Sequence, residues 1–155
     1  MKMLFLYSII LSIISYLGYS QVYEGNNASL IIPGCSKVWI QQNSSIPAFI
    51  EFKPQNQIIV SDFKNWVSET FNLDKRYDFI LIDTSTDEIG YTHYKYREYY
   101  SGYPIEKAIY IIHAINGKIS SMNGLLFDKI NVDLNYTLQE SQALNNALKS
   151  IHADL

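Results

Sequence analysis

Residues 90–124 read GYTHYKYREYYSGYPIEKAIYIIHAINGKISSMNG, and this stretch decides the fold. Its first part, residues 91–100, alternates in a way typical of a β-strand, whose successive side chains point to opposite faces. The cations would then gather on a single face of the strand. One face would carry Tyr91, His93, Lys95, Arg97 and Tyr99, and the other would carry Thr92, Tyr94, Tyr96, Glu98 and Tyr100.

The rest of this stretch predicts two more strands. Ser101 and Gly102 supply a turn, and the chain returns through IEKAIYIIHA, residues 105–114. This return strand is apolar on both faces from Ala108 to Ile112, as expected of a central strand that is covered twice. Asn116 and Gly117 are the strongest hairpin signal in the chain, and they lead into KISSMNG, residues 118–124. We therefore expect three adjacent antiparallel strands.

Upstream segments predict a hairpin, a helix and a further strand. SKVWIQQ (36–42) and PAFIEFK (47–53) are two short runs with strand periodicity, so we expect them to pair. A helix is predicted over residues 62–72, capped by Ser61, with one apolar stripe. Its strand partner would begin with the apolar run 79–82 and end at Asp83, where turn-forming residues follow. The helical stripe consists of Phe63, Trp66, Val67 and Phe71.

The tail predicts a second helix, from about Leu138. Thr137 and Glu140 have the spacing of a capping box, in which a hydroxyl and a carboxylate satisfy free backbone amides at a helix start. The fold class is therefore α+β, an antiparallel sheet with the helix 62–72 on one face and a C-terminal helix. We expect the apolar stripe of the helix 62–72 to bury against the sheet and to organise the core. The stripe of the second helix consists of Ala143, Leu144, Ala147, Leu148 and Ile151.

Composition indicates one folded domain without a general attraction to polyanions. The chain has 155 residues, of which 48% are hydrophobic and 17% charged, so it is not of the disordered class. Its 15 acidic and 12 basic residues leave a net charge of -3, which does not favour nucleic acid or anionic lipid. The only local cationic cluster, Lys95, Arg97 and Lys107, is offset by Glu98 and Glu106. No nucleic-acid partner is expected.

Residues 1–20, MKMLFLYSIILSIISYLGYS, have the pattern of a secretory signal peptide. Lys2 precedes an apolar core, and Gly18 and Ser20 occupy the positions before a cleavage site at Gln21; the alternative is a site one or two residues later. A further alternative is an uncleaved anchor, but the apolar run is shorter than the ~20 residues that span a bilayer. We therefore expect a secreted, periplasmic or cell-envelope protein, which contacts the membrane only through its signal peptide. Cys35 is the single cysteine and is expected to be a small buried or turn residue.

The sequence offers no pattern for catalysis. A zinc site would need three or four converging ligands, so His93 and His113 would have to meet across the strands together with a carboxylate. A hydrogen-bonded sheet histidine is the simpler expectation for each of them, and His152 stands alone in the tail. HExxH and G-x-S-x-G are absent from the sequence, as is a phosphate-binding Gly-rich loop. We expect a protein that is not an enzyme and has no cofactor, metal ligand or catalytic residue.

The stretch from Gly90 to Gly124 resembles the signature of the fungalysin/thermolysin propeptide (FTP) domain, which precedes secreted thermolysin-like zinc metalloproteases. In that family an aromatic and basic strand, a turn glycine, a hydrophobic strand ending in His, and a hairpin glycine lead to a final Asn-Gly. Glu98 departs from the pattern, because the family usually has Gln there. The matching residues are His93, Tyr96, Arg97, Tyr99, Tyr100, Gly102, Pro104, Ile105, His113, Gly117, Lys118, Asn123 and Gly124.

The resemblance implies the division of the chain and its function. Residues 1–20 would be the signal peptide, 21–34 an entry segment and 35–127 an FTP-like propeptide domain. Residues 128–155 would be a linker and the first helix of a PepSY-like module. The implied function is a pro-region that assists folding and latency of a thermolysin-like catalytic domain, in cis or in trans, either as a fragment or as a stand-alone copy. The alternative is an exported module that binds protein or carbohydrate through its Tyr-rich hairpin, for which Tyr91, Tyr99 and Tyr103 would form a flat exposed row.

Overall fold

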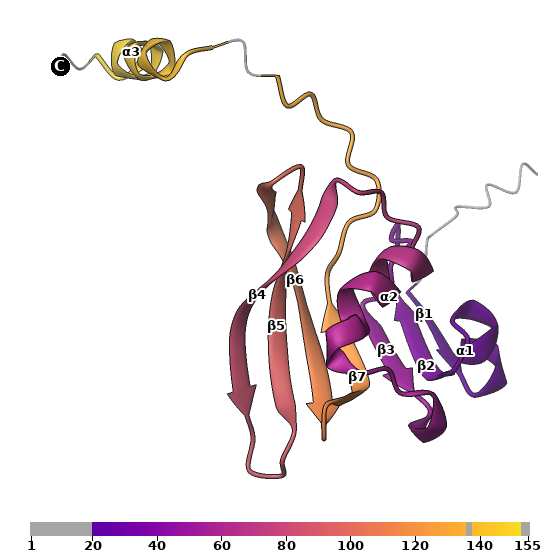
Figure 1. Cartoon of the computed structure of the whole chain (residues 1–155). Coiled ribbons are helices and arrows are strands. Elements are labelled where there is room, and N and C mark those ends of the chain that lie inside the picture. Colours follow the sequence, from indigo (N-terminus) through magenta and orange to yellow (C-terminus); the bar gives the residue numbers. More distant parts are fainter. Residues whose placement is uncertain (1–19, 136–137, 153–155) are drawn as a thin grey trace, which may run out of the picture.

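The computed structural model describes residues 20–135 and 138–152. They form an antiparallel sheet with short helices, so the predicted α+β class is confirmed (Figure 1). The expected signal peptide lies outside the described residues, apart from Ser20. The strands are β1 (Gln21–Glu24), β2 (Cys35–Ile40), β3 (Phe49–Phe52), β4 (Tyr77–Thr86), β5 (Thr92–Tyr100), β6 (Tyr103–Ile115) and β7 (Lys118–Gly124); the α-helices are α1 (Asn26–Ile31), α2 (Phe63–Thr70) and α3 (Glu140–Ser150).

The seven strands follow the order β1-β2-β3-β7-β6-β5-β4, and all neighbours are antiparallel. The predicted pairing of residues 36–42 with 47–53 is confirmed as β2–β3, and the predicted three-strand unit is confirmed as β5–β6–β7. The segment 21–34 contributes β1 and α1 to the same sheet. β3 and β7 join the N-terminal strands to the ribbon 90–124, so the domain forms around one continuous sheet.

The register divides the sheet into a covered inner face and an open face. One row of paired residues crosses the inner face, and its members are buried or pack on the core that includes Ala28 of α1 and Phe63 of α2. Because both helices contribute to this one cluster, they cover the same face of the sheet. The inner row is Tyr23, Val38, Ile50, Met122, Ile112 and Tyr94.

The prediction that β6 is covered twice is wrong. Ala108, Tyr110 and Ile112 are fully buried on the inner face, whereas Ile109 and Ile111 on the other face are partly exposed. The apolar residues of the second face thus contribute to an open surface rather than to a second core. For β5 the predicted alternation is confirmed, since Tyr96, Glu98 and Tyr100 are buried.

Helix α2 begins and ends differently from the prediction. Ser61 does not cap it, because residues 60–62 form a 3₁₀ turn that runs directly into the helix at Phe63. Asn72, with φ 51°, ends the helical path. Phe63 and Val67 are fully buried, and Trp66 is partly buried and packs against the core, so the expected stripe does face the sheet. The Trp66 ring covers the edge of the core against Phe52, at a centroid distance of 5.3 Å.

Strand β4 is longer than predicted and lies at the edge of the sheet. The strand does not end at Asp83 but continues to Thr86, with a bulge between Leu81 and Asp83. The turn lies instead at residues 87–90, where Asp87 Oδ1 accepts hydrogen bonds from the amides of Ile89 and Tyr91. The apolar residues 80–82 are exposed because β4 has a neighbour on one side only.

Helix α3 follows an extended segment and lies apart from the sheet in Figure 1. It begins at Glu140 rather than near Leu138, and the Gln142 side chain accepts the hydrogen bond of the Gln139 amide. The predicted cap residue Thr137 lies outside the described residues. The residues of α3 are exposed except for the partly buried Leu148, and none belongs to the core cluster. In the described ranges, no helix is both long and apolar enough to cross a membrane.

Candidate functional site

The open face of the sheet holds the candidate site. Its pairing register sets two parallel rows of side chains side by side, one largely apolar and one polar. Both rows run from the N-terminal strands to the ribbon that carries the sequence signature. The apolar row is Val22, Trp39, Phe49, Asn123 and Ile111, and the polar row is Lys37, Glu51, Ser121, His113 and His93.

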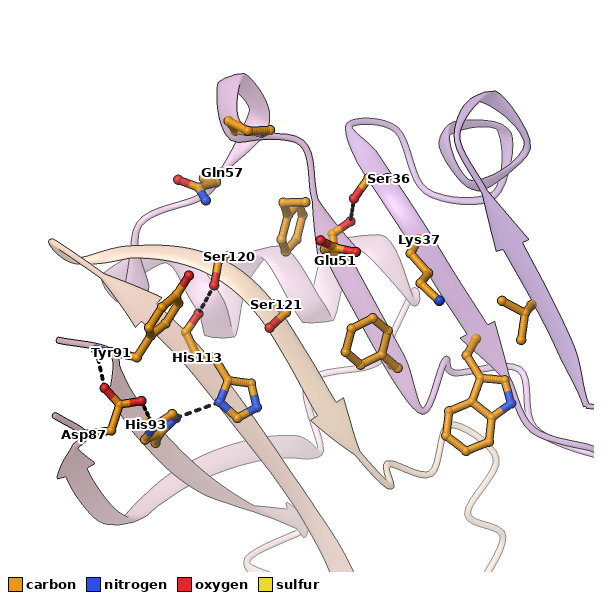
Figure 2. Close-up of a pocket in the computed structure, with 15 residues that line it drawn as sticks. Ser36, Lys37, Glu51, Gln57, Asp87, Tyr91, His93, His113, Ser120 and Ser121 are labelled. Atoms are coloured by element: carbon orange, nitrogen blue, oxygen red, sulfur yellow. Dashed lines mark hydrogen bonds and ion pairs between the residues drawn. The ribbon is translucent and has the colours of Figure 1, made fainter. Parts of the chain in front are cut away.

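A groove of about 1080 Å³ lies on the open face (Figure 2). It is lined by all five residues of the polar row and by Val22, Trp39 and Phe49 of the apolar row. Trp39 and Val22 are 37% and 56% exposed, so a partner that bound here would remove large apolar side chains from water. The polar row lies beside them, where Lys37 and Glu51 offer charges of opposite sign. Such an arrangement of apolar area with a few orienting polar groups suits a protein surface better than a small anion.

The signature histidines meet in the polar row. His93 of β5 and His113 of β6 are directly paired across the strands, and their Nδ1 atoms lie 2.6 Å apart. His93 Nε2 lies 3.1 Å from Asp87 Oδ2, and His113 Nε2 lies 2.6 Å from Asn123 Oδ1. Figure 2 shows the two rings pointing toward one another beside Asp87. The four side chains form one hydrogen-bonded chain, which we call the histidine chain.

The histidine chain ends in a side-chain oxygen on each side. Asp87 Oδ2 accepts a hydrogen bond from His93 Nε2–H, and Asn123 Oδ1 accepts one from His113 Nε2–H. Rotation of the Asn123 amide would present a donor to His113 Nε2 instead. In either arrangement every ring nitrogen has a partner.

Asp87 is held in its ionised form. Burial alone would raise the pKa of Asp87, but hydrogen bonds from the Tyr91 amide and from His93 outweigh burial, so its pKa lies below the ordinary value. His93 and His113 do meet a carboxylate across the strands, yet their facing nitrogens bond to each other rather than converge on one point. Over the described residues, no group of three or more His, Cys, Asp or Glu side chains is arranged to hold a metal ion.

The other signature residues lie at different positions in the sheet. Tyr96 and Glu98 are buried on the inner face, whereas Arg97 is exposed on the open face. Gly102 and Gly117 occupy turns with positive φ. Three further positions lie where strands meet: Tyr99 pairs with Pro104, and Gly124 lies against the backbone of β6.

The tyrosines do not form the exposed row that the alternative function requires. Tyr91 and Tyr99 lie at opposite ends of β5 and are partly buried, and only Tyr103 is well exposed, at 57%. The Cys35 thiol is fully buried, which raises its pKa to about 12. It is therefore an inert part of the core, as expected.

Sequence reasoning missed the N-terminal half of the open face and the role of Asp87. Trp39 and Phe49 carried no signal beyond strand periodicity. Asp87 stood in a cluster of turn residues, where its side chain was expected to serve the turn only. An aspartate in the turn that precedes a strand beginning T-H is nevertheless close to that histidine in sequence, and this proximity could have suggested the contact.

The fold and the site define an α+β domain with one helix-covered sheet face and one open face suited to protein contact. Residues 77–126 match the family model described as Fungalysin/Thermolysin Propeptide Motif, which confirms the FTP resemblance. The match spans β4 to β7, the half of the sheet that carries the histidine chain. This part of the chain is therefore similar to a propeptide motif of fungalysin and thermolysin. No curated protein matches the chain.

Proposed function

We propose that this protein is a pro-region that assists folding of a thermolysin-like zinc metalloprotease and keeps it latent. The observation that carries the proposal is the propeptide motif over residues 77–126. The partner is the catalytic domain of such a protease, in cis or in trans. The same proposal makes residues 1–20 a signal peptide, residues 35–127 the FTP-like domain, and residues 128–155 a linker with the first helix of a PepSY-like module.

The open face supplies the contact surface in this proposal. A rigid sheet presents Trp39 and Phe49 without loss of backbone freedom, because these residues are already fixed in paired strands. The polar row, which includes the signature residues His93 and His113, would orient the partner. A surface that binds a folding intermediate of the protease more tightly than its unfolded chain lowers the barrier to folding, and continued binding blocks the substrate site.

Kinetic and refolding assays test the proposal. The full chain is mixed with a thermolysin-like catalytic domain, and peptide hydrolysis and the yield of refolded protease are measured. We expect slower hydrolysis and a higher yield. If the chain changes neither quantity, the proposed pro-region function is wrong.

A matched pair of variants tests the contact surface separately. Trp39→Arg places a charge in the apolar row and should weaken inhibition about tenfold or more, as loss of a central aromatic contact does. Leu30→Arg makes the same change on α1, at a side chain that is 82% exposed and away from the open face, and should leave inhibition unchanged. Equal inhibition by the two variants would place the contact surface elsewhere, even if the pro-region function holds.

A further inference from the structure

A buried carboxyl group lies where the sheet gives way to the C-terminal connector. Glu98 is fully buried on the inner face of β5. Its Oε2 accepts a hydrogen bond of 2.9 Å from the backbone amide of Phe127, just beyond β7. Its Oε1 is also buried and has no hydrogen-bond partner among the described residues. A carboxylate with one unsatisfied oxygen is costly to bury, whereas the protonated form is much less so.

The cover over Glu98 is a short irregular segment, residues 125–130, which we call the exit segment. It is held by a few hydrogen bonds rather than by regular pairing: Leu125 N–H donates to Ile109 O at 2.9 Å, and Ile130 N–H donates to the Tyr77 hydroxyl at 3.2 Å. Ser45 also bonds to Asp128. Such a segment can open locally at a lower cost than the sheet.

The groups around Glu98 oppose its ionisation. Asp128 of the exit segment adds a like charge, and burial raises the pKa of the Tyr77 hydroxyl on β4, which therefore brings no positive charge to Glu98. Arg76 lies over the Tyr100 ring and is paired with Asp74. On β6 the nearby charged residues Glu106 and Lys107 are exposed. Burial, partly offset by the Phe127 amide and reinforced by Asp128, raises the pKa of Glu98 to about 7.

We propose that Glu98 and the exit segment form a clasp that is closed while the carboxyl group is protonated and opens when it ionises, which frees the start of the connector to α3. Opening lets water reach the carboxylate without disturbing the strands. The clasp is a property of this chain alone and does not depend on the protease partner.

The sign of the pH dependence follows from the two states. When the clasp is open and Glu98 is exposed, its carboxyl group has the ordinary pKa of about 4.5. Protonation stabilises the closed clasp fully below that pH, and this stabilisation is lost as the pH rises to about 7. Between these values the population of the open form should rise about tenfold per pH unit. Above pH 7 it should level off, because Glu98 is then ionised in both states.

Hydrogen exchange of backbone amides, followed by NMR in the full chain from pH 4 to 8.5 and corrected for intrinsic exchange, tests the clasp. The protection of the Phe127 and Ile130 amides should fall over this range by a total on the order of a hundredfold, while that of Ile112 at the centre of β6 should stay constant. Constant protection in the exit segment would overturn the proposal. So would a parallel fall at Ile112, which would indicate unfolding of the whole sheet.

Three variants distinguish a titrating clasp from a merely structural contact. Glu98→Gln keeps the shape and cannot ionise, so its exit segment should show no pH dependence; wild-type behaviour in this variant would overturn the proposal. Asp128→Asn removes the like charge beside Glu98, so the fall in protection of the exit-segment amides should be smaller and should end at a lower pH. This variant keeps the test valid if Glu98→Gln does not fold. Tyr77→Phe removes the acceptor of Ile130 and should lower protection there by the same factor at every pH.

Discussion

At the scale of single residues, the structure explains why the signature ends in glycine. Gly124 has a φ of 143° and lies so close to β6 that a Cβ atom would be 2.1 Å from Ile109 O and 2.9 Å from Tyr110 Cα. Both contacts are with backbone, which cannot rotate away as a flexible side chain could. The glycine is therefore required by the close approach of the paired strands β6 and β7, next to the Asn123 that completes the histidine chain.

Gly124→Ala should lower the free energy of unfolding by about 2–4 kcal/mol, because overpacking and backbone strain add. Gly102→Ala is the matched control: its φ is 85°, but no atom lies within 4 Å of the new methyl group, so the loss should be about 1 kcal/mol. Urea unfolding measures both. Equal losses would show that conformation, and not the contact with β6, explains the glycine at position 124.

The histidine chain predicts a specific pairwise energy. A double-mutant cycle on His113→Ala and Asn123→Ala should give a coupling of about 0.5–1.5 kcal/mol in unfolding free energy, as a direct hydrogen bond does. His93 and Asn123 do not bond to each other, so the corresponding cycle with His93→Ala should give a smaller value. A larger coupling for the second pair would mean that the chain is not connected as described.

At the scale of elements, the contact between the two histidines could not be predicted from the turns. The tight turn after β5 pairs Tyr100 with Tyr103, and a regular ladder would then place His93 opposite Tyr110. Between the pairs Tyr99–Pro104 and Arg97–Ile109, however, β6 inserts extra residues opposite Glu98 alone. This irregularity, with Lys107 at a φ of 63°, shifts the register so that His93 meets His113.

What the sequence could predict was the local pattern of each element. Period-2 alternation correctly placed Tyr96, Glu98 and Tyr100 on one face, because alternation follows from backbone geometry alone. The number of faces that a sheet covers depends on where distant segments pack, so the open second face of β6 did not follow from its apolar residues. For the same reason the depth of Trp66 did not follow from the helical stripe to which it belongs: the ring packs at the margin of the core.

Helix α2 predicts a clear order of destabilisation. Phe63 is fully buried and contacts the rings of Phe79 and Tyr96, so Phe63→Ala should cost about 3–5 kcal/mol. Trp66→Ala should cost less, about 1–3 kcal/mol, because part of this ring remains in water. Chemical denaturation monitored by circular dichroism measures the two values, and the reverse order would contradict the assigned depths.

At the scale of the whole molecule, the described chain consists of one packed sheet domain and a terminal helix outside its core. The core cluster ends at Leu126, and Leu144 and Ile151 of α3 are 48% and 70% exposed. An isolated helix of this length is marginal in water, and α3 contributes no residue to the core cluster. The domain should therefore fold to the same stability without it.

Two truncations test this division of the chain. Ending the chain after Asn131 removes α3 and should change the free energy of unfolding of the sheet by less than about 0.5 kcal/mol, since no core residue is lost. Ending it after Gly124 also removes Leu126, which is 3% exposed, and uncovers Glu98. That truncation should cost about 1.5–3 kcal/mol for the lost apolar burial alone. If the shorter deletion destabilised the sheet as much as the longer one, α3 would have to pack on the domain, and its exposed stripe would be part of the core rather than a surface for another module.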